Sequence, residues 1–470
     1  MLNEQQLKQL DNIFNPRSIA VVGVTDSKSN VGYSTLEAIV EGGFKGKVYP
    51  VHPRHKEILG LPVYASIEDV PGPLDLVVAA LNQYASAEIV DICAKRGVKG
   101  VILLAGGFKE MGEEGAKLER GMIETAQKWG CMVIGPNCLG FINTPYDLVS
   151  VFFPLKIPKG NISIITQSGG AGLTVLNRLL DENIGISKWI GVGNRGSLEF
   201  ADYLQYLEQD PTTDVIGVLM EATDNAREFV EIARKTVKTK PVVVYKSGKS
   251  ELAQYAALTH TGTLAGSPRM YEDAFHQYGV IYVRTLLELA AACKALSIAP
   301  PAKGDGIGMI THTAGPTIVM VDEISSRGCP VPNLSEEALR RVKELLGTKN
   351  SETVILKNPL DLAGVGFEPV AFGKFNDVLC QDPGIDIIIG VFSEHRNWRF
   401  PADEMIENLK KHRKPIIACF ISKIDGVCEV MEQLHKAGIP VFTNPDEAAW
   451  GAAALAQYYR YQKKALSQKD

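Results

Sequence analysis

The side chain best suited to chemistry is a histidine set among small residues. His260 lies within Ala257–Gly266, where two glycines and three threonines surround it. A neutral imidazole nitrogen is nucleophilic near pH 7 and is a good acceptor of a phosphoryl group. A lone histidine is more often structural, but this setting offers backbone freedom and hydroxyl donors rather than a core for the ring. The segment therefore indicates phosphoryl transfer through His260.

A phosphorylated histidine also needs a carboxylate that orients its second ring nitrogen. Glu221 directly follows the apolar run Val215–Met220, and the carboxyl ends of parallel strands are where ligands bind in open α/β sheets. We therefore expect Glu221 to orient the histidine. The alternative is that Glu221 is a feature of the fold, because Glu394 follows a similar run later in the chain.

A third segment has the composition of an anion cradle. Ser168, Gly169 and Gly170 follow the apolar run Lys159–Thr166 and precede a predicted helix at 173–180. Small residues let the backbone approach an anion closely, and the first N–H groups of a helix are unpaired. Glycines that serve only packing are the alternative, which a weaker echo at 313–315 supports in part.

A turn near the amino terminus predicts a nucleotide site. The segment Gly23–Gly32 joins a predicted strand to a predicted helix, but Thr25 stands where Gly-x-Gly-x-x-Gly needs its second glycine. The next strand ends in Tyr49–Lys56, with neutral and basic residues where an NAD site needs an acid. The extra 3′-phosphate of coenzyme A suits this edge better than NAD does. A corner that binds no ligand is the remaining alternative.

Strands and helices alternate through the whole chain and must position these segments. Short β-branched runs such as Ser18–Gly23 alternate with helical patterns such as 113–129. This alternation is typical of βαβ units, in which helices cover both faces of a parallel sheet. A Pro/Gly stretch at 300–306 indicates a linker. We therefore predict an α/β fold of three doubly wound domains, Rossmann-like at 1–145 and flavodoxin-like at 146–299 and 304–465.

An internal repeat supports this division. Three landmarks recur in the same order in the second and third predicted domains: Ile164–Gly170 with Met309–Gly315, Gln209–Asp214 with Gln381–Asp386, and Lys240–Val244 with Lys414–Ala418. Residues present in only one copy are better candidates for a functional site. This favours the His260 segment, since the later copy has nothing like it after its Lys-Pro strand.

Composition and charge exclude several classes of function. The 470 residues carry 49 Lys and Arg against 54 Asp and Glu, a formal net charge of −5, and no long basic run indicates nucleic-acid binding. The amino terminus is too polar for a signal peptide, and no apolar run approaches the ~20 residues of a membrane span. The eight cysteines form no Cys-x-x-Cys pair, so we expect no metal site and a reducing, cytoplasmic location.

Taken in order, the motifs resemble the α subunit of NDP-forming acyl-CoA synthetases, chiefly the ADP-forming acetyl-CoA synthetases, which are related to succinyl-CoA synthetase. The marks of the resemblance, which covers nearly the whole chain, are Gly42–Val51 (GGFKGKVYPV), Gly135–Gly140 (GPNCLG), Ser168–Gly170, Thr259–Gly266 and Asn358–Leu362 (NPLDL). Thr259 and Gly170 depart from the Ser and Ala that are common in the family. Both changes keep a hydroxyl group or a small side chain, so they concern the details of the substrate and not the chemistry.

The resemblance implies a role for each candidate residue. His260 would carry the phosphoryl group and Glu221 would orient it. The phosphate and thioester would be surrounded by Ser168, Gly169, Gly170, Asn137 and Cys138. Coenzyme A would be bound by Gly23, Val24, Thr25, Ser27, Asn30, Val31, Gly32, Pro53, Arg54 and Lys56.

The resemblance also implies a partner. The sequence shows neither an ATP-grasp domain nor a P-loop, so a separate ATP-grasp β subunit would bind ATP or ADP and Mg²⁺, in an α2β2 heterotetramer. The expected reaction interconverts a small carboxylic acid and its acyl-CoA, with ADP phosphorylation. A CoA-binding regulatory or sensing module is the main alternative, against which His260 and Glu221 argue. An NAD dehydrogenase is a third hypothesis, against which Arg54 argues.

Overall fold

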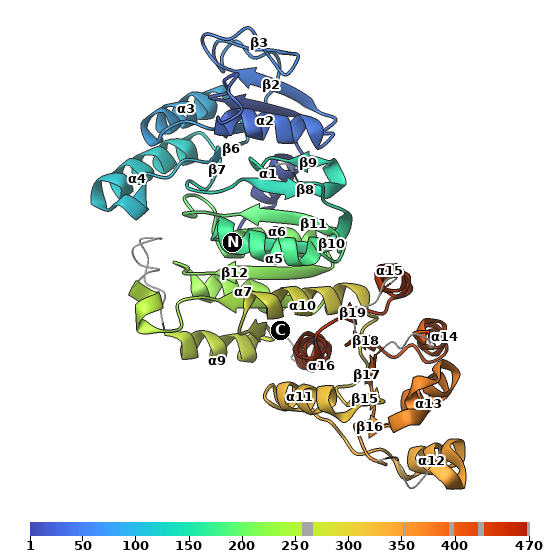
Figure 1. Ribbon diagram of the computed structural model, residues 1–470. Helices are drawn as coiled ribbons and strands as arrows, with labels where there is room; N and C mark the ends of the chain where they lie inside the picture. The colour runs from blue at the N-terminus through green and yellow to red at the C-terminus, as the bar shows by residue number, and fades with distance from the viewer. Residues whose placement is uncertain are drawn as a thin grey trace. The chain divides into compact units, whose positions relative to one another are not determined.

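The computed structural model describes residues 1–153, 155–255, 267–350, 354, 356–393, 399–421 and 427–467, with the backbone alone at 348–350 and 427–428. The chain divides into two compact units, Met1–Leu286 and Leu287–Asp470. Unit 1 holds two of the main sheets and unit 2 holds the third, as Figure 1 shows. The fold is thus built from doubly wound α/β layers, as predicted. The predicted domain boundaries at 145 and 299 stay predictions.

The first sheet of unit 1 is parallel and has helices on both faces. Its strands, in spatial order, are β2 (Lys47–Val51), β1 (Ser18–Val22), β5 (Leu76–Ala79), β6 (Gly100–Leu103) and β7 (Met132–Ile134). Its helices are α1 (Glu4–Phe14), α2 (Val31–Glu41), α3 (Gln83–Arg96) and α4 (Glu113–Lys128), and the small hairpin β3 (Glu57–Ile58) and β4 (Leu61–Pro62) follows β2. Most of the apolar strand residues are buried, which explains why these runs are continuously hydrophobic.

The second sheet of unit 1 extends the same plan with an antiparallel edge. Its spatial order is β14 (Ile281–Val283), β13 (Val242–Lys246), β12 (Val215–Met220), β10 (Lys159–Thr166), β11 (Ile186–Gly191), β8 (Phe141–Asn143) and β9 (Leu148–Val149). Helix α5 (Gly169–Leu180) crosses from β10 to β11. The helices α6 (Phe200–Gln209), α7 (Ala226–Thr236) and α9 (Pro268–Tyr278) pack against one another in sequence.

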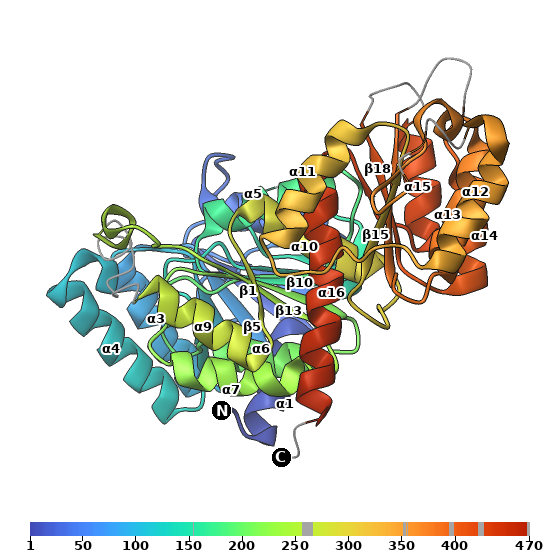
Figure 2. The same ribbon diagram turned by 90° about the horizontal axis from the view of Figure 1, so that it is seen from below.

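Unit 2 repeats the parallel part of this topology. Its strands are β16 (Leu360–Asp361), β15 (Ile307–Thr311), β17 (Ile387–Phe392), β18 (Ile416–Phe420) and β19 (Val441–Phe442). Its helices are α10 (Leu286–Ile298), α11 (Ala314–Ser325), α12 (Glu336–Asn350), α13 (Pro369–Gln381), α14 (Ala402–His412), α15 (Val427–Ala437) and α16 (Pro445–Ser467). Helix α11 lies along α16 (Figure 2). Ala291 and Ala295 of α10 belong to the core beside β15 and β17, because their small side chains admit close packing.

All three main sheets share one strand order. Numbered along the chain, the parallel strands of each sheet run 2-1-3-4-5, with the first strand in the interior of the sheet. In this order the connections on the two sides of the first strand run over opposite faces of the sheet. A crevice therefore opens at the carboxyl end of that strand. The crevice falls after β1 in the first sheet, after β10 in the second and after β15 in the third.

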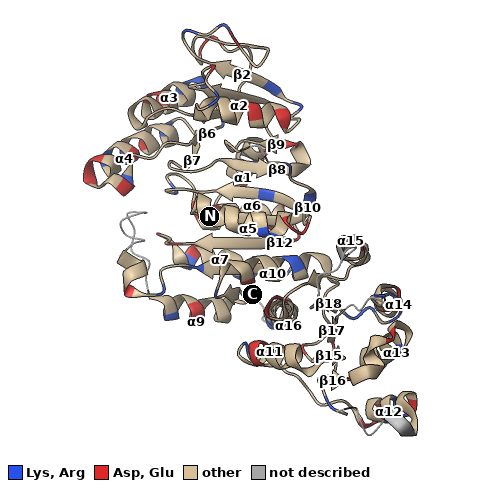
Figure 3. Ribbon diagram, viewed as in Figure 1, with Lys and Arg blue, Asp and Glu red and all other residues tan. Residues whose placement is uncertain are grey.

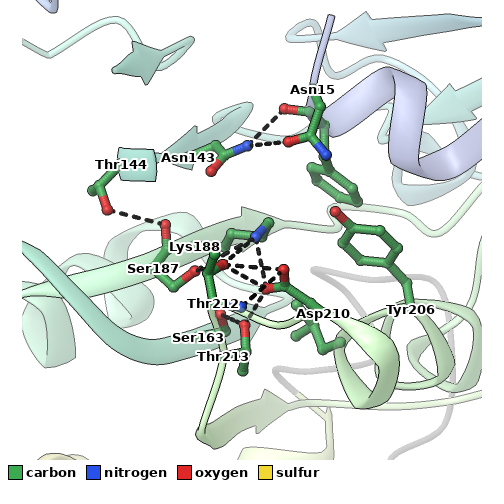
Figure 4. Close-up of polar contacts among 12 residues, drawn as sticks. Asn15, Asn143, Thr144, Ser163, Ser187, Lys188, Tyr206, Asp210, Thr212 and Thr213 are labelled. Atoms are coloured by element: carbon green, nitrogen blue, oxygen red, sulfur yellow. Dashed lines mark hydrogen bonds and ion pairs between the residues drawn. The ribbon is translucent and has the colours of Figure 1, made fainter. Parts of the chain in front are cut away.

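The strands carry few charged side chains, as Figure 3 shows, and Lys188 on β11 is an exception. Its Nζ is 2.7 Å from the Asp210 carboxylate and 3.0 Å from the Thr212 hydroxyl, and both charged side chains are at most 6% exposed. Thr213 also donates to Asp210 (Figure 4). Burial lowers the pKa of Lys188, and Asp210 opposes that effect. Because Asp210 precedes β12, this network lies at the amino edge of the sheet and stabilises the fold away from the crevice.

Candidate functional site

The crevice of the second sheet brings two candidate segments together. Gln167 follows β10, and Glu221 follows the neighbouring strand β12. Because the two strands are paired in parallel up to Thr166 and Leu219, both residues lie at the same edge of the sheet. The side-chain oxygen of Gln167 accepts the backbone N–H of Glu221 and that of Ala222, each at 3.0 Å. Glu221 therefore stands at the carboxyl end of a buried strand, held to the residue that precedes the predicted phosphate cradle.

The predicted phosphate cradle is the first turn of α5. Ser168 is the N-cap of the helix, and its Oγ accepts the N–H of Ala171 at 3.4 Å. A Cβ at Gly169 would lie 2.4 Å from Leu139, so this glycine is needed for packing, whereas a Cβ at Gly170 would meet nothing within 4 Å. The first turn is thus open beside Gly170. Its unpaired N–H groups and the helix dipole favour an anion there.

The loop that carries Asn137 and Cys138 faces this turn. It is held to the loop after β11, where Asn194 N–H donates to the Pro136 carbonyl at 2.8 Å. Gly193 has φ +52°, and a Cβ there would lie 2.2 Å from the Pro136 oxygen, so only glycine allows this approach. A cavity of about 310 Å³ lies between these two loops and the first turn of α5. It is lined by Leu104, Asn137, Cys138, Leu139, Phe152, Gln167, Ser168, Gly169, Gly170, Gly193 and Asn194.

The thiol of Cys138 is not a nucleophile in this setting. It is 6% exposed, and its Sγ donates to the Leu103 carbonyl at 3.4 Å. Burial raises the pKa of the thiol to about 12, so it stays protonated at neutral pH. Cys138 therefore contributes shape to the wall of the cavity rather than covalent chemistry.

Glu221 also contacts a buried cation that the sequence analysis did not select. Lys246 at the end of β13 is 2% exposed, and its Nζ donates to the carbonyls of Glu221 and Ser247 at 2.5 and 2.7 Å. Burial lowers the pKa of Lys246 to about 8, against the effect of the Glu221 charge. Gln167 and Lys246 together hold the N–H and the carbonyl of Glu221, so its backbone is fixed on both sides.

A group of polar residues behind the cavity was also missed. Asn194 Nδ2 donates to Glu110 at 2.6 Å and to Glu119 at 3.1 Å. Burial disfavours ionisation of both carboxyls. For Glu110 the hydrogen bonds from Asn194 and from the Gly107 and Phe108 N–H groups outweigh burial and lower the pKa, whereas for Glu119 burial prevails and raises it. These residues lie far apart in sequence and show no spacing that marks a site.

The crevice of the first sheet contains the predicted coenzyme A turn. Gly23 has φ +87°, and a Cβ on Gly32 would lie 2.7 Å from the Gly23 carbonyl, so the turn and the start of α2 are in close contact. Asn30 caps α2, and its Oδ1 accepts the N–H groups of Tyr33 at 2.8 Å and Thr25 at 3.3 Å. The turn is therefore preformed around a helix N-terminus, with Ser27 and Val31 exposed beside it.

The second strand of that sheet supplies a basic edge. Val22 and Val51 are register partners, so the residues after β2 lie at the same edge as the turn. Pro53, Arg54 and Lys56 are exposed there. Burial is the main cause that lowers the pKa of His52, with His55 and Arg54 adding to it and Asp26 opposing it. Exposed cations beside a helix N-terminus suit a phosphate-bearing ligand.

His260 and Glu394 lie outside the described residues. The strand registers nevertheless correct the predicted equivalence of Glu394 and Glu221. Ile162 pairs with Val215 in the second sheet, and the corresponding Ile307 pairs with Ile387 in the third. Counting on from these pairs places Ser393, not Glu394, opposite Glu221 in the repeat. The segment equivalent to Val215–Glu221 is Ile387–Ser393, so the prediction placed its end one residue too late.

The part of the chain that the structure describes contains no cluster of three or more His, Cys, Asp or Glu side chains arranged to hold a metal ion. Among the same residues, none of the helices combines the length and the hydropathy needed to cross a membrane.

Comparison with known proteins identifies the family. A CoA-binding domain matches residues 17–144, and a succinyl-CoA-ligase-like flavodoxin domain matches residues 159–296. The α subunit of acetate–CoA ligase (ADP-forming) II from Pyrococcus furiosus is 35% identical, over 95% of this chain and 97% of that protein. The chain belongs to the family of ADP-forming acetate–CoA ligase α subunits.

Relatives of this family also occur as longer chains. The ADP-forming acetate–CoA ligase I of Archaeoglobus fulgidus is 33% identical over 98% of this chain, which spans 65% of that protein. Among solved structures, the acetyl-coenzyme A synthetase 1 of Ca. Korarchaeum cryptofilum, in complex with phosphate and ADP, matches with a TM-score of 0.88 and 29% identity. The match covers 98% of this chain and 99% of that one. The family resemblance drawn from the motifs is thereby confirmed.

Proposed function

We propose that this chain is the α subunit of an ADP-forming acyl-CoA synthetase. The reaction is acid + CoA + ATP ⇌ acyl-CoA + ADP + phosphate, and it runs through an acyl phosphate and a phosphohistidine. The observation that carries the proposal is the 310 Å³ cavity at the start of α5, with Glu221 held at the adjacent strand end by Gln167. Similarity along nearly the full length of a named α subunit supports the same function.

The proposed chemistry divides into three transfers. In the direction that forms ATP, an oxygen of inorganic phosphate attacks the thioester carbon; the C–O bond forms, the C–S bond breaks, and CoA leaves as a thiolate that takes up a proton. A ring nitrogen of His260 then attacks phosphorus and forms an N–P bond, while the bond from phosphorus to the acyl oxygen breaks and releases the carboxylate. ADP finally accepts the phosphoryl group as the N–P bond breaks.

The residues of this chain would bind, orient and stabilise the reacting groups. The N–H groups of the first turn of α5, with Ser168, would hold the phosphate oxygens, and Asn137 would face them across the cavity. Glu221 would orient the imidazole of His260 and stabilise its positive charge. The neutral thiol of Cys138 would exclude water near the thioester.

The first sheet supports coenzyme A as the co-substrate. The preformed turn at Gly23–Gly32 offers backbone N–H groups at the start of α2, and Arg54 and Lys56 supply cations at the same edge. A nucleotide with several phosphates fits this donor set. We further propose that an ATP-grasp β subunit binds ATP or ADP and Mg²⁺. The holoenzyme would be an α2β2 heterotetramer, located in the cytoplasm.

The decisive experiment uses this chain produced together with a candidate ATP-grasp partner. The purified complex should form acetyl-CoA, or another acyl-CoA from a panel of acids, in proportion to the ADP released. It should also become labelled by [γ-³²P]ATP. His260→Ala should abolish both the labelling and the turnover, since it removes the proposed phosphoryl carrier.

A matched control separates the chemistry from a general effect of losing a histidine. His276 is an exposed residue of α9, so His276→Ala should retain wild-type labelling and turnover. Normal acyl-CoA formation by the His260→Ala complex would contradict the phosphohistidine mechanism. Binding of CoA without turnover against any acid would favour the alternative of a regulatory module.

A further inference from the structure

The side-chain oxygen of Gln167 is hydrogen-bonded, but its Nε2 has no partner among the described residues. Its side-chain oxygen accepts two backbone N–H groups, of Glu221 and Ala222, at 3.0 Å each. The residue is only 6% exposed, and its Nε2 is a buried donor with no hydrogen-bond partner among the described residues. Most buried polar atoms are paired, so an orphaned donor needs an explanation.

The orientation of the amide is fixed by the contacts that it makes. Turning the side chain over would place its NH2 group against the N–H groups of Glu221 and Ala222, donor facing donor. The oxygen must therefore face β12, and Nε2 must be the donor that stays available. An acceptor that arrives from outside the fold is the group that would satisfy it.

The same residue is part of the cavity wall. Gln167 lines the 310 Å³ cavity together with Ser168, Gly170 and Asn137, and it precedes the first turn of α5. An anion held by the α5 N-terminus would bring oxygen atoms to this wall. The unpaired helix N–H groups and the orphaned amide donor thus point independently to one oxygen-rich ligand.

We propose that Gln167 is a catalytic residue that donates a hydrogen bond from Nε2 to an oxygen of the acyl phosphate formed in this cavity. The inference rests on the proposed function, because it needs that intermediate to form here. The acceptor is either a phosphoryl oxygen or the acyl oxygen on which charge develops when phosphate attacks the thioester. Both are oxygen acceptors, and the kinetic constants distinguish them.

Two substitutions separate the donor from the acceptor. Gln167→Glu keeps an oxygen for the N–H groups of Glu221 and Ala222 but replaces the NH2 donor, whereas Gln167→Met removes both. A residue that only holds the Glu221 backbone would leave Gln167→Glu close to wild type and impair Gln167→Met. A residue that donates to the reacting group would impair both variants, by about 100-fold in kcat/KM, as the loss of one donor to a developing charge does elsewhere.

The chain offers a control for the burial of a carboxylate. Asn376 on α13 is fully buried, its Oδ1 accepts from Asn408, and its Nδ2 has no partner among the described residues. Asn376→Asp therefore makes the same chemical change in a core that lines no proposed site. It should lower the melting temperature as Gln167→Glu does, but leave the kinetic constants of the folded complex unchanged.

The assay uses the complex with acetyl-CoA, inorganic phosphate and ADP. A rise in the KM for phosphate alone identifies a phosphoryl oxygen as the acceptor, and a fall in kcat at unchanged KM values identifies the acyl oxygen in the transition state. Wild-type rates in Gln167→Glu would overturn the inference while the proposed function stands. A wild-type complex without any acyl-CoA turnover would overturn the proposed function itself. If Gln167→Glu fails to fold, Gln167→Met is assayed in its place: wild-type rates there overturn the inference, as does a loss that changes the KM for phosphate and kcat together, whereas a change confined to one of them supports it.

Discussion

Lys246 should titrate far below an ordinary lysine, and its replacement should reveal the cost of burying it. The side chain is 2% exposed, with its Nζ on the carbonyls of Glu221 and Ser247. Burial lowers its pKa from the ordinary 10.5 to about 8. At about 1.4 kcal/mol for each tenfold change in proton affinity, the folded state disfavours the charged form by about 3 kcal/mol.

The sign of the effect sets the pH window. At pH 7 Lys246 is charged in both the folded and the unfolded chain, so the folded protein carries the full cost. Between pH 8 and 10.5 the folded state gives up the proton while the unfolded chain still holds it. The free energy of unfolding of wild type should therefore rise relative to Lys246→Met by about 2–3 kcal/mol between pH 7 and pH 10.

Two measurements check this prediction. Lysine labelled with ¹³C at the ε carbon should give one signal that titrates near pH 8 in wild type and is missing from Lys246→Met. Urea unfolding of unit 1, followed by the fluorescence of the buried Trp189, should show the difference in stability. Lys246→Arg, which keeps its charge throughout, provides a reference without titration. A Lys246 signal that titrates at 10 or above would refute the reasoning.

Three further predictions follow from other contacts. Gly32→Ala should weaken CoA binding by tenfold or more in calorimetry, because the new methyl group would lie 2.7 Å from the Gly23 carbonyl; unchanged affinity would argue against CoA at this turn. Cys138→Ala should keep activity within a few-fold of wild type, because burial raises the pKa of that thiol to about 12; loss of all turnover would contradict a neutral wall residue. Lys188→Met or Asp210→Leu alone should destabilise the protein by about 3–5 kcal/mol in urea unfolding, whereas the double variant should be closer to wild type. Additive losses would show that the ion pair is not coupled.

The layered α/β fold could be read from the sequence because its signal is strong and local. Runs such as Ile19–Val22 are apolar at every position, and the structure buries all of their residues. The repeat between the second and third sheets was also visible. The predicted partner of Glu221 in the repeat was one residue too late: counting from the matched landmarks Gln209 and Gln381 already reaches Ser393, and the strand registers place Ser393 there as well.

The candidate site was predicted where glycines and a helix start mark it, and missed where long-range contacts create it. Ser168 and Gly170 could be selected from composition. Gln167 and Lys246 could not, since their roles depend on two neighbouring strands that meet Glu221 from both sides. Asn30 was expected to contact the ligand, but its Oδ1 is engaged by the N–H groups of its own turn, a local bond that a capping pattern could have indicated.

The central claim is that this chain moves a phosphoryl group from an acyl phosphate to His260. The most direct test incubates the complex with acyl-CoA and [³²P]phosphate in the absence of any nucleotide. The account predicts one label on His260 for each acid and each CoA released, stable to base and lost in acid. It also predicts transfer of that label to ADP when ADP is added. Release of acid and CoA without a label on His260, or labelling that persists in His260→Ala, would contradict it.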